Sequence, residues 1–389
     1  MATKQDIPAG KFNASTSNIF LFYMYCCPCI IRFVTYIDYT ILYIRLWRNI
    51  MSLVGILVAN RNQRKNVLRQ YLQSNTMNLK LFCFTPSSIN WKRKRIIGLY
   101  RSKGKWMLGH FPFPKVVYNR CYDTDRQFME RLGAAIGIKK CFNHINQFNK
   151  QEIYTNLSKW LSDYLPATVP FDKEKAIQLL KAHKDVYFKP CYGHQGKGVI
   201  RAEMQASGEI HIGHHYFSPE IIFQDTQQFQ ESIQKLLGTT PYIMQEGIPI
   251  QQIDNRVFDI RALVQKNENG LWSVTNLVSR IATKGSFNTS IFDEVCLSHE
   301  ILNRLYPPDK AAHITRSIYD ISLRSAEIMD ENTAYHLGEF SVDFALDNDE
   351  HAWIIELNGK PQKSLYADIR DQNAVYLRPM QYAKYLCKR

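Results

Sequence analysis

The sequence lacks the cysteine patterns of metal-binding and disulfide-rich proteins. Its nine cysteines are scattered apart from Cys26, Cys27 and Cys29, and no CxxC pair is followed by a second pair. A structural zinc site or a disulfide framework is therefore poorly supported, and reduced thiols in the cytoplasm are the default expectation. Internal repeats and low-complexity tracts are absent too, and the composition is not that of a disordered chain.

Sequence signatures of nucleophilic catalysis and of the P-loop are also missing. The chain has no nucleophile elbow and no arrangement of Ser, His and Asp that would form a triad. It has no Walker A motif, because GxxxxGK followed by Ser or Thr does not occur. Cys191 lies beside a glycine-rich turn, where we expect a small packing residue and not a nucleophile.

Long uninterrupted apolar runs are scarce. The uncharged stretch from Asn18 to Ile31 is short for a bilayer span, and Arg32, Asp38 and Arg45 interrupt its continuation. The sequence does not indicate a signal peptide either. No basic start directly precedes the apolar run, and the stretch has no small-residue cleavage site. Met51 then opens MSLVGILVAN, which is typical of a buried first strand. We therefore predict that residues 1–50 are an atypical hydrophobic extension outside the fold, not translated in the native protein, and we expect no membrane span.

Acidic residues are outnumbered by basic ones. The formal net charge is +14 and the hydrophobic content of the 389 residues is 45%, enough for two or three domains around a sizeable core. Nucleotide phosphate, nucleic acid and anionic cell-wall or spore polymers would all suit the charge. The basic cluster WKRKR at residues 91–95 has neither aromatic interleaving nor a nucleic-acid motif around it. We interpret it as a solvated turn and expect no nucleic-acid partner.

Two regions of different pattern follow the extension. In residues 51–149, short apolar strands (VGILVA, LKLFCF, KVVYN) alternate with basic helical stretches, which predicts a small α/β domain. From residue 150 to residue 389 the pattern is α+β, with helices KQEIYTNLSKWLSDYL and AAHITRSIYDISLRSAEIMDEN and strands VYFKP, PYIMQEGIPI, RVFDIRALVQK and LWSVTNLVSRIA.

The most informative pattern is a pair of strands near the C-terminus. GEFSVDFALD and HAWIIELNGKP are separated by an acidic turn containing Asn348 and Asp349, which predicts an antiparallel hairpin. Glu356 and Asn358 are two residues apart and share a face, and Asp343 can meet them across the pair. Carboxylate and amide oxygens suit Mg²⁺ bound together with substrate phosphates. The alternative is a pair of solvated strand residues.

Two further groups could bind phosphate. Lys189 and Pro190 end a strand and are followed by Gly193, Gly196 and Gly198, where backbone amides could approach phosphate oxygens; a plain hairpin turn is the alternative. Asp259 and Arg261 share a strand face near Arg256 and Arg280, and the aspartate could orient an arginine toward phosphate. For this group the alternative is a surface ion-pair ladder of little stabilising effect.

The order of these motifs resembles the ATP-grasp superfamily, and most closely its YheC/YheD family of endospore coat-associated proteins. The resemblance extends from Met51 nearly to the C-terminus, in the stretches VVYNR, FNKQEIYTNL, YLPAT, VYFKPCYGHQGKGVIR, DIRALVQKN, LWSVTNLVSRIA and WIIELNGKP. It implies an ATP-grasp fold, in which two α+β lobes within residues 150–389 hold ATP. A small Rossmann-like pre-ATP-grasp domain, residues 51–149, would precede it.

The resemblance also implies roles for individual residues. Those that match nucleotide-binding positions are Lys150 and Lys189 at the phosphates, the loop Gly193, His194, Gln195, Gly196, Lys197 and Gly198, and the hinge Gln245, Glu246, Gly247 and Ile248. Those that match magnesium ligands are Asp343, Glu356 and Asn358, with Glu356 bridging two ions; Mn²⁺ is an alternative metal. Arg261 and Arg280 match arginines that hold the transferred phosphate and the acyl phosphate.

The sequence differs from the family pattern in two places that bear on these residue roles. His194 stands where the family's loop commonly has a small hydroxyl residue, and KGSFNTSIFDE replaces the usual glycine-rich turn with its asparagine, so that Asn288 becomes the candidate for that role.

The implied activity is an ATP-dependent carboxylate–amine ligase that acts through an acyl phosphate. Its acyl donor and amine are not identified by the sequence. A non-catalytic coat protein with the same fold and a kinase are the alternatives. The resemblance implies cytoplasmic synthesis, association with the spore coat and other coat proteins as partners.

Overall fold

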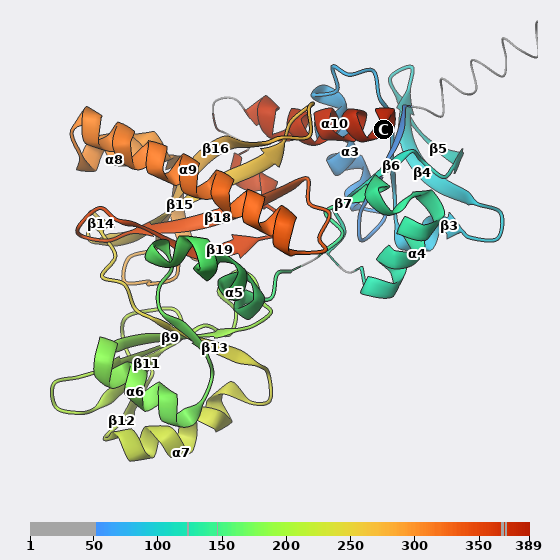
Figure 1. The fold of residues 1–389 in the computed structure, drawn as a ribbon. Coiled ribbons are helices and arrows are strands. Elements are labelled where there is room, and N and C mark those ends of the chain that lie inside the picture. The colour runs from blue at the N-terminus through green and yellow to red at the C-terminus, as the bar shows by residue number, and fades with distance from the viewer. Residues whose placement is uncertain (1–51, 123, 146, 367–368, 370–371) are drawn as a thin grey trace, which may run out of the picture. The chain divides into compact units, whose positions relative to one another are not determined.

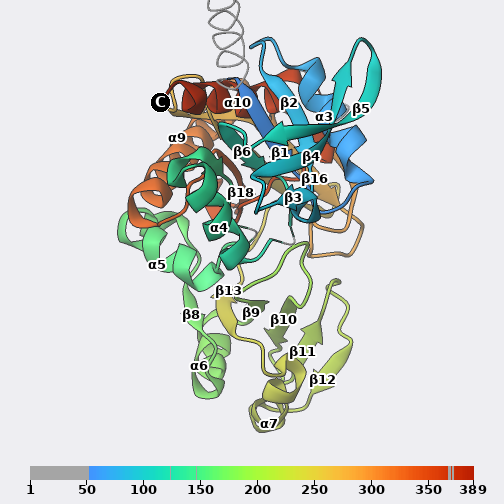
Figure 2. The same ribbon diagram turned by 90° about the vertical axis from the view of Figure 1, so that its right-hand side faces the viewer.

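The computed structural model describes residues 52–389, except 123, 146, 367, 368, 370 and 371. The predicted extension, residues 1–50, lies outside the described residues. Three sheets account for the described strands, and Figures 1 and 2 show them from two directions. Within the described part of the chain, no helix combines the length and apolar character needed to cross a bilayer.

The first sheet is mixed. Its strands are β1 (Leu53–Leu57), β2 (Lys80–Phe84), β3 (Ile89–Asn90), β4 (Arg95–Ser102), β5 (Lys105–Pro112), β6 (Val116–Asn119) and β7 (Cys141–Phe142). β2, β1, β6 and β7 are parallel neighbours in that order, as alternation with helices α3 (Gln63–Gln73) and α4 (Arg126–Ile136) predicts. The antiparallel strands β3, β4 and β5 extend the sheet beyond β2, and the three apolar strand segments of the sequence did not foresee them.

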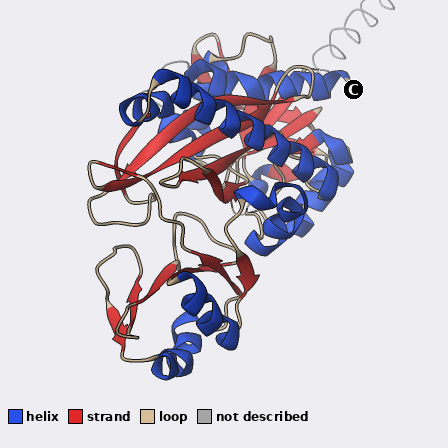
Figure 3. Ribbon diagram, turned by 60° about the vertical axis from the view of Figure 1, so that its left-hand side comes forward, coloured by secondary structure: helices blue, strands red, loops and turns tan. Residues whose placement is uncertain are grey.

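The second sheet is antiparallel and has two helices on one face (Figure 3). Its order is β12-β11-β10-β9-β13-β8, with the bounds β8 (Thr168–Pro170), β9 (Asp185–Pro190), β10 (Ile200–Met204), β11 (Ile210–Gly213), β12 (Ile221–Phe223) and β13 (Tyr242–Glu246). Helices α6 (Lys173–His183) and α7 (Thr226–Leu237) bury Leu180, Phe229 and Ile233 against Phe188 and Met244. This apolar layer leaves the other face of β9 and β13 available to a ligand site.

The third sheet is also antiparallel. Its order is β17-β16-β15-β18-β19, and β14 pairs with β15; the bounds are β14 (Gln252–Ile253), β15 (Arg256–Lys266), β16 (Trp272–Ala282), β17 (Phe292–Leu297), β18 (Glu339–Leu346) and β19 (Ala352–Asn358). Helices α5 (Lys150–Leu161), α8 (Ser298–Leu305) and α9 (Pro308–Asn332) share one apolar core with this sheet, to which Ile260, Ile318 and Phe344 belong. The β18–β19 pair is the hairpin that the sequence predicts.

The register of the third sheet brings the charged residues to its other face. Asp259 lies opposite Arg280, Arg261 lies opposite Asp343, and Asp343 lies opposite Glu356. Residues directly opposite each other in an antiparallel pair point to the same side. The five side chains therefore share one face, away from α9.

The C-terminal helix joins the first and third sheets. α10 (Gln372–Lys388) contributes Val375, Met380 and Leu386 to a core that also contains Val54 of β1 and Val278 of β16. Residues near the end of the chain thus complete the core of the first sheet. The predicted domain boundary at residue 149 stays a prediction.

A buried polar network lies in the same region. Glu339 of β18 accepts from Lys363 Nζ at 2.6 Å, from Gln265 Nε2 at 2.7 Å and from Arg120 Nη1 at 3.3 Å, and it also accepts from the Tyr118 hydroxyl. Burial alone would raise the pKa of Glu339, but Lys363 and Arg120 outweigh it and keep the pKa below its usual value. The network connects β6 to β15 and β18, so it ties together segments that are far apart in the sequence.

We expect Glu339→Gln to lower the free energy of unfolding by about 3–5 kcal/mol, because Lys363 and Arg120 would keep buried charges without a counter-charge. Urea unfolding followed by circular dichroism measures the change. The double substitution Glu339→Gln/Lys363→Met should recover part of the loss. A single substitution that unfolds at the wild-type urea concentration would contradict a stabilising role for the pair.

Candidate functional site

A cavity of about 520 Å³ collects most of the residues that the sequence singles out. Its walls come from β9 and β13 of the second sheet and from β15, β16, β18 and β19 of the third. Of the predicted site residues, only Gly198 and Gly247 are not in its lining; those that line it are Lys150, Lys189, Gly193, His194, Gln195, Gly196, Lys197, Gln245, Glu246, Ile248, Arg261, Arg280, Asn288, Asp343, Glu356 and Asn358.

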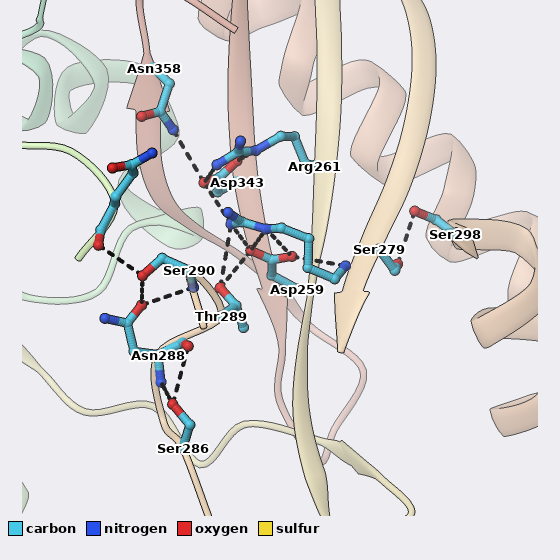
Figure 4. Close-up of polar contacts among 12 residues, drawn as sticks. Asp259, Arg261, Ser279, Ser286, Asn288, Thr289, Ser290, Ser298, Asp343 and Asn358 are labelled. Carbon is cyan, nitrogen blue, oxygen red and sulfur yellow. Dashed lines mark hydrogen bonds and ion pairs between the residues drawn. The ribbon is translucent and has the colours of Figure 1, made fainter. Parts of the chain in front are cut away.

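Asp343 is the centre of the charged wall of this cavity (Figure 4). Its side chain accepts two hydrogen bonds from Arg261, Nε and Nη2 each lying 2.6 Å from a carboxylate oxygen, and a third from Asn358 Nδ2 at 3.2 Å. Asp343 is only 4% exposed, so it is not the solvated strand residue of the alternative interpretation. Burial alone would raise its pKa, but Arg261 and Arg280 outweigh burial and hold the pKa of Asp343 below its usual range.

Arg280 is oriented by two residues. Asp259 accepts from Arg280 Nε at 3.1 Å and also pairs with Nη2, and Thr289 Oγ1 donates to Asp259 Oδ2 at 2.7 Å. Arg280 Nη2 also lies 3.3 Å from Asp343 Oδ2. Asp259, Arg261 and Arg280 are all buried, which excludes a surface ion-pair ladder. The sequence predicts that Asp259 orients an arginine; it does not predict the part of Thr289, which follows the candidate Asn288.

Two lysines approach the same wall from the other side. Asn149 caps α5 by accepting from the backbone N–H groups of Gln151 and Glu152, which places Lys150 at the first helical position. Lys150 Nζ lies 2.9 Å from Glu356 Oε1. Lys189 Nζ donates to Gln245 Oε1 at 2.5 Å, and burial lowers the pKa of Lys189 to about 8, an effect that Glu356 partly offsets.

The glycine-rich loop after β9 is held by the segment after β16. Gln195 and Gly196 have φ of 58° and 66°, in the left-handed region. A Cβ atom at Gly196 would lie 1.9 Å from Asn288 Nδ2, so the loop has no room for a side chain there. Ser290 Oγ donates to the Gln195 carbonyl at 2.8 Å. The KGSFNTSIFDE segment therefore contacts the predicted phosphate loop directly.

The predicted hinge residues lie at the end of β13. Gln245 Nε2 donates to Thr168 Oγ1 at 3.0 Å, while Gly247 N donates to the Asp185 carbonyl at 2.7 Å. Glu246 accepts from Ala167 N at 2.7 Å and pairs with His183 Nδ1 at 2.7 Å. A ribose hydroxyl at this point would have to share Glu246 with those two partners.

The sequence analysis did not predict several of the residues that line the cavity. Tyr122 follows β6 in the chain and donates from its hydroxyl to the Lys360 carbonyl at 3.1 Å, and Gln362 lies two residues beyond Lys360. Lys360 is buried and donates to the Cys121 carbonyl. Lys360 and Gln362 lie just after the ELN motif, and this position could have predicted that they line the cavity. Nothing near Tyr122 in the sequence points to this cavity.

The donor atoms of the site fit a hard cation. Among the described residues, no cluster of three or more His, Cys, Asp or Glu side chains could hold a metal ion. The set that faces the cavity is mixed, two carboxylates and the amide of Asn358, and these oxygens suit Mg²⁺ when phosphate oxygens and water complete the coordination. Asp343 would share its oxygens between the ion and the two guanidinium groups.

Asp343→Ala is expected to lower the free energy of unfolding by about 3–5 kcal/mol, because Arg261 and Arg280 would be left buried with less counter-charge. Thermal unfolding measures the effect. The matched control is Asp254→Asn, which removes the charge of an exposed carboxylate paired with Arg304, suits the left-handed backbone at this position and should change the unfolding free energy by under about 1 kcal/mol. Equal effects of the two substitutions would contradict a central role for Asp343.

Comparisons with known proteins concern the family and the fold of the chain. A family model described as YheC/D like ATP-grasp matches residues 139–386. The endospore coat-associated protein YheD of Bacillus subtilis (strain 168) is 25% identical over 328 residues, 79% of this chain and 71% of the relative. YheC of the same organism, also named an endospore coat-associated protein, is 22% identical over 324 residues, 79% of this chain and 88% of the relative.

A solved structure supports the fold alone. The crystal structure of the D-cycloserine synthetase DcsG is similar with a TM-score of 0.51 at 13% identity, over 86% of this chain and 99% of that one. Together with the family match, which covers more than half of the sequence, it shows that this chain has the ATP-grasp fold and belongs to the YheC/D-like ATP-grasp family.

Proposed function

We propose that this chain is an ATP- and Mg²⁺-dependent ligase that joins a carboxylate to an amine through an acyl phosphate. The observation that supports this most directly is the single cavity in which Lys150, Lys189 and the glycine-rich loop face Asp343 and Glu356. One wall supplies cations and backbone amides for phosphates, and the other supplies oxygen ligands beside two arginines. The D-cycloserine synthetase DcsG has the same fold, which is compatible with the proposal.

Binding of ATP depends on the second sheet and α5. Lys150 and Lys189 would contact the phosphates, and the loop from Gly193 to Gly198 would cover them with backbone N–H groups. In the structure Lys150 pairs with Glu356, and Lys189 pairs with Gln245. Nucleotide phosphate would therefore replace neighbours that already hold both ammonium groups in the cavity.

Asp343, Glu356 and Asn358 would hold Mg²⁺ next to the phosphates, and the ion would supply positive charge that offsets charge on the transferred group. Arg280, fixed by Asp259 and Thr289, faces the same space and would stabilise the developing negative charge with its guanidinium group. Because Asp259 and Thr289 hold Arg280 before the substrate arrives, little reorganisation is needed during the reaction.

The chemical steps require no protein nucleophile. An oxygen of the substrate carboxylate attacks the γ-phosphorus of ATP, the bond to the β–γ bridging oxygen breaks, and ADP leaves. The amine then attacks the acyl carbon, phosphate departs, and the amine loses a proton as the amide forms. Arg261 and Arg280 would contact the phosphoryl group in both steps.

We also propose that the protein acts in association with the spore coat. Two relatives that cover 79% of this chain are named endospore coat-associated proteins, and this likeness is what supports the proposal. The carboxylate and the amine would then come from coat components. Binding of ATP without turnover would instead fit a coat protein without catalytic activity.

The decisive test is a thermal-shift titration with Mg·ATP. Wild-type protein should gain about 2.7 kcal/mol at a hundredfold excess of ligand over its dissociation constant, whereas Glu356→Ala should lose most of this gain. Glu331→Ala, an exposed carboxylate outside the cavity, is the control and should respond as the wild type does. No shift in the wild type would refute nucleotide binding.

Release of ADP in the presence of peptide and amino-acid carboxylates then separates the possible activities. Amide formation that depends on an amine supports a ligase. A phosphorylated product that accumulates even when amines are present indicates a kinase, and no ADP release with any carboxylate speaks against catalysis.

Affinity for ATP should fall as the pH rises above about 8. Burial lowers the pKa of Lys189 to about 8, and only its protonated form attracts phosphate, so each further pH unit should weaken binding by up to about tenfold. Isothermal titration calorimetry at several pH values measures the slope. Lys189→Arg, which stays protonated, should bind with little dependence on pH in that range. The same slope in both proteins would assign the titration to another group.

A further inference from the structure

The positive charge of this chain is concentrated in one region. Residues 52–122 contain 14 Lys and Arg and no Asp or Glu, whereas residues 123–389 contain 30 Lys and Arg and 33 Asp and Glu. The net charge of the whole chain is +14, so the first sheet and its connections contain as much positive charge as the entire excess. Charge asymmetry on this scale indicates an anionic partner for the region.

The β4–β5 hairpin presents one open face. Opposite residues in its register are Ile97 with His110, Leu99 with Leu108 and Arg101 with Trp106, and each pair shares a side of the hairpin. We call this surface, made by these six residues and Arg95, the β4–β5 face. Its opposite side carries Ile96, Gly98 and Phe111, which pack near Phe82.

Apolar side chains occupy the middle of the β4–β5 face. Ile97 is 44% exposed and Leu108 is 60% exposed, whereas β1 and β6 of the same sheet are buried along their whole length. β5 pairs with β4 on one side and with no other strand among those described, so its second edge is available for backbone hydrogen bonds. An extended segment could therefore lie along β5 and cover Leu108.

Cations surround this apolar centre. Arg95 and Arg101 lie on the β4–β5 face, and Lys103 and Lys105 lie at the hairpin turn; all four are exposed. In the part of the chain that the structure describes, none of the four forms an ion pair, in contrast to Arg201 of the second sheet, which pairs with Asp185. An apolar centre with a charged rim is the usual anatomy of a protein–protein interface.

We propose that the β4–β5 face is a docking site for an extended acidic polypeptide segment that presents apolar side chains flanked by acidic ones on one of its faces, in the spacing Glu-x-Leu-x-Leu-x-Glu. Acidic side chains would meet Arg95, Arg101 and the turn lysines, and apolar ones would cover Ile97 and Leu108. The inference concerns a binding partner and does not depend on nucleotide binding at the cavity.

Other occupants fit the β4–β5 face less well. A nucleic acid would use the cations but would leave Ile97 and Leu108 exposed. A membrane would require apolar residues at the hairpin tip, where the sequence from Ser102 to Lys105 is Ser-Lys-Gly-Lys. The same face of a second copy would bring like charges together, because residues 52–122 have no acidic side chain.

The test uses the full chain and a labelled peptide of about ten residues that alternates Thr with Glu or Leu in the order Glu-Thr-Leu-Thr-Leu-Thr-Glu, so that the acidic and apolar side chains share one face. Fluorescence anisotropy should show saturable binding that weakens with salt. Arg95→Glu/Arg101→Glu should bind at least about tenfold more weakly, and Leu108→Ser several-fold more weakly. Lys175→Glu/Lys181→Glu, with the same change of charge on exposed positions of α6, should bind as the wild type does.

Three results would overturn the proposal. The first is equal binding of poly-glutamate and of the alternating peptide, together with no effect of Leu108→Ser. The second is loss of binding in the α6 control equal to that in the β4–β5 variant. The third is tighter binding of duplex DNA or of phosphatidylglycerol vesicles. Circular dichroism and a cooperative thermal unfolding transition show whether each variant is folded, and the exposed Leu108→Ser keeps the test valid if the double arginine variant is not.

Discussion

The Arg261–Asp343 pair is the interaction on which the candidate site depends. It joins β15 to β18 across the middle of the third sheet, and both partners are buried, so each charge requires the other. Arg280 contacts the same carboxylate from β16, and Asn358 contacts it from β19. Four adjacent strands thus converge on one aspartate, whose position sets the place of the other charged side chains.

The loops add a second constraint at the other side of the cavity. Gly196 and Gln195 contact Asn288 and Ser290, and Ser286 Oγ donates to the His215 carbonyl at 2.8 Å. The segment after β16 therefore touches both the glycine-rich loop and the connection after β11. Since Thr289 in the same segment holds Asp259, the loops and the arginine wall are mechanically connected. This arrangement explains why a segment that departs from the family pattern can still belong to the site.

The inner side and the outer hairpin of the first sheet differ in burial and in charge pairing. Its inner side is tied to the third sheet by α10 and by Glu339, whose carboxylate is surrounded by Lys363, Arg120 and Gln265. Its outer hairpin has cations that form no ion pair with any described residue, and three exposed apolar residues, Ile97, Met107 and Leu108. Charged side chains are buried where they hold distant segments together. Side chains on the β4–β5 face, where a partner would bind, are exposed.

Much of the fold could be predicted from local pattern. RVFDIRALVQK and LWSVTNLVSRIA became β15 and β16, joined by a turn from Asn267 to Gly270, and GEFSVDFALD became a strand of the predicted hairpin. The helix expected at KQEIYTNLSKWLSDYL likewise became α5, which Asn149 caps. These features succeed because strand alternation, helix capping and turn chemistry depend on neighbours within a few residues. The sequence analysis did not predict strands β3, β4 and β5. They carry exposed apolar residues and lack a clear alternation of apolar and polar residues.

By itself the sequence determined the order of the motifs, the types of side chain at the cavity and the concentration of positive charge in residues 52–122. Only the tertiary structure decided that Asp343 is buried between two arginines, that Thr289 steadies Asp259 and that Tyr122 reaches the cavity from the first sheet. Glu339 is the clearest case, because Tyr118 and Lys363, its partners, come from β6 and from the segment after β19. Such contacts depend on the packing of segments that are far apart in the sequence, which the spacing of neighbouring residues does not encode.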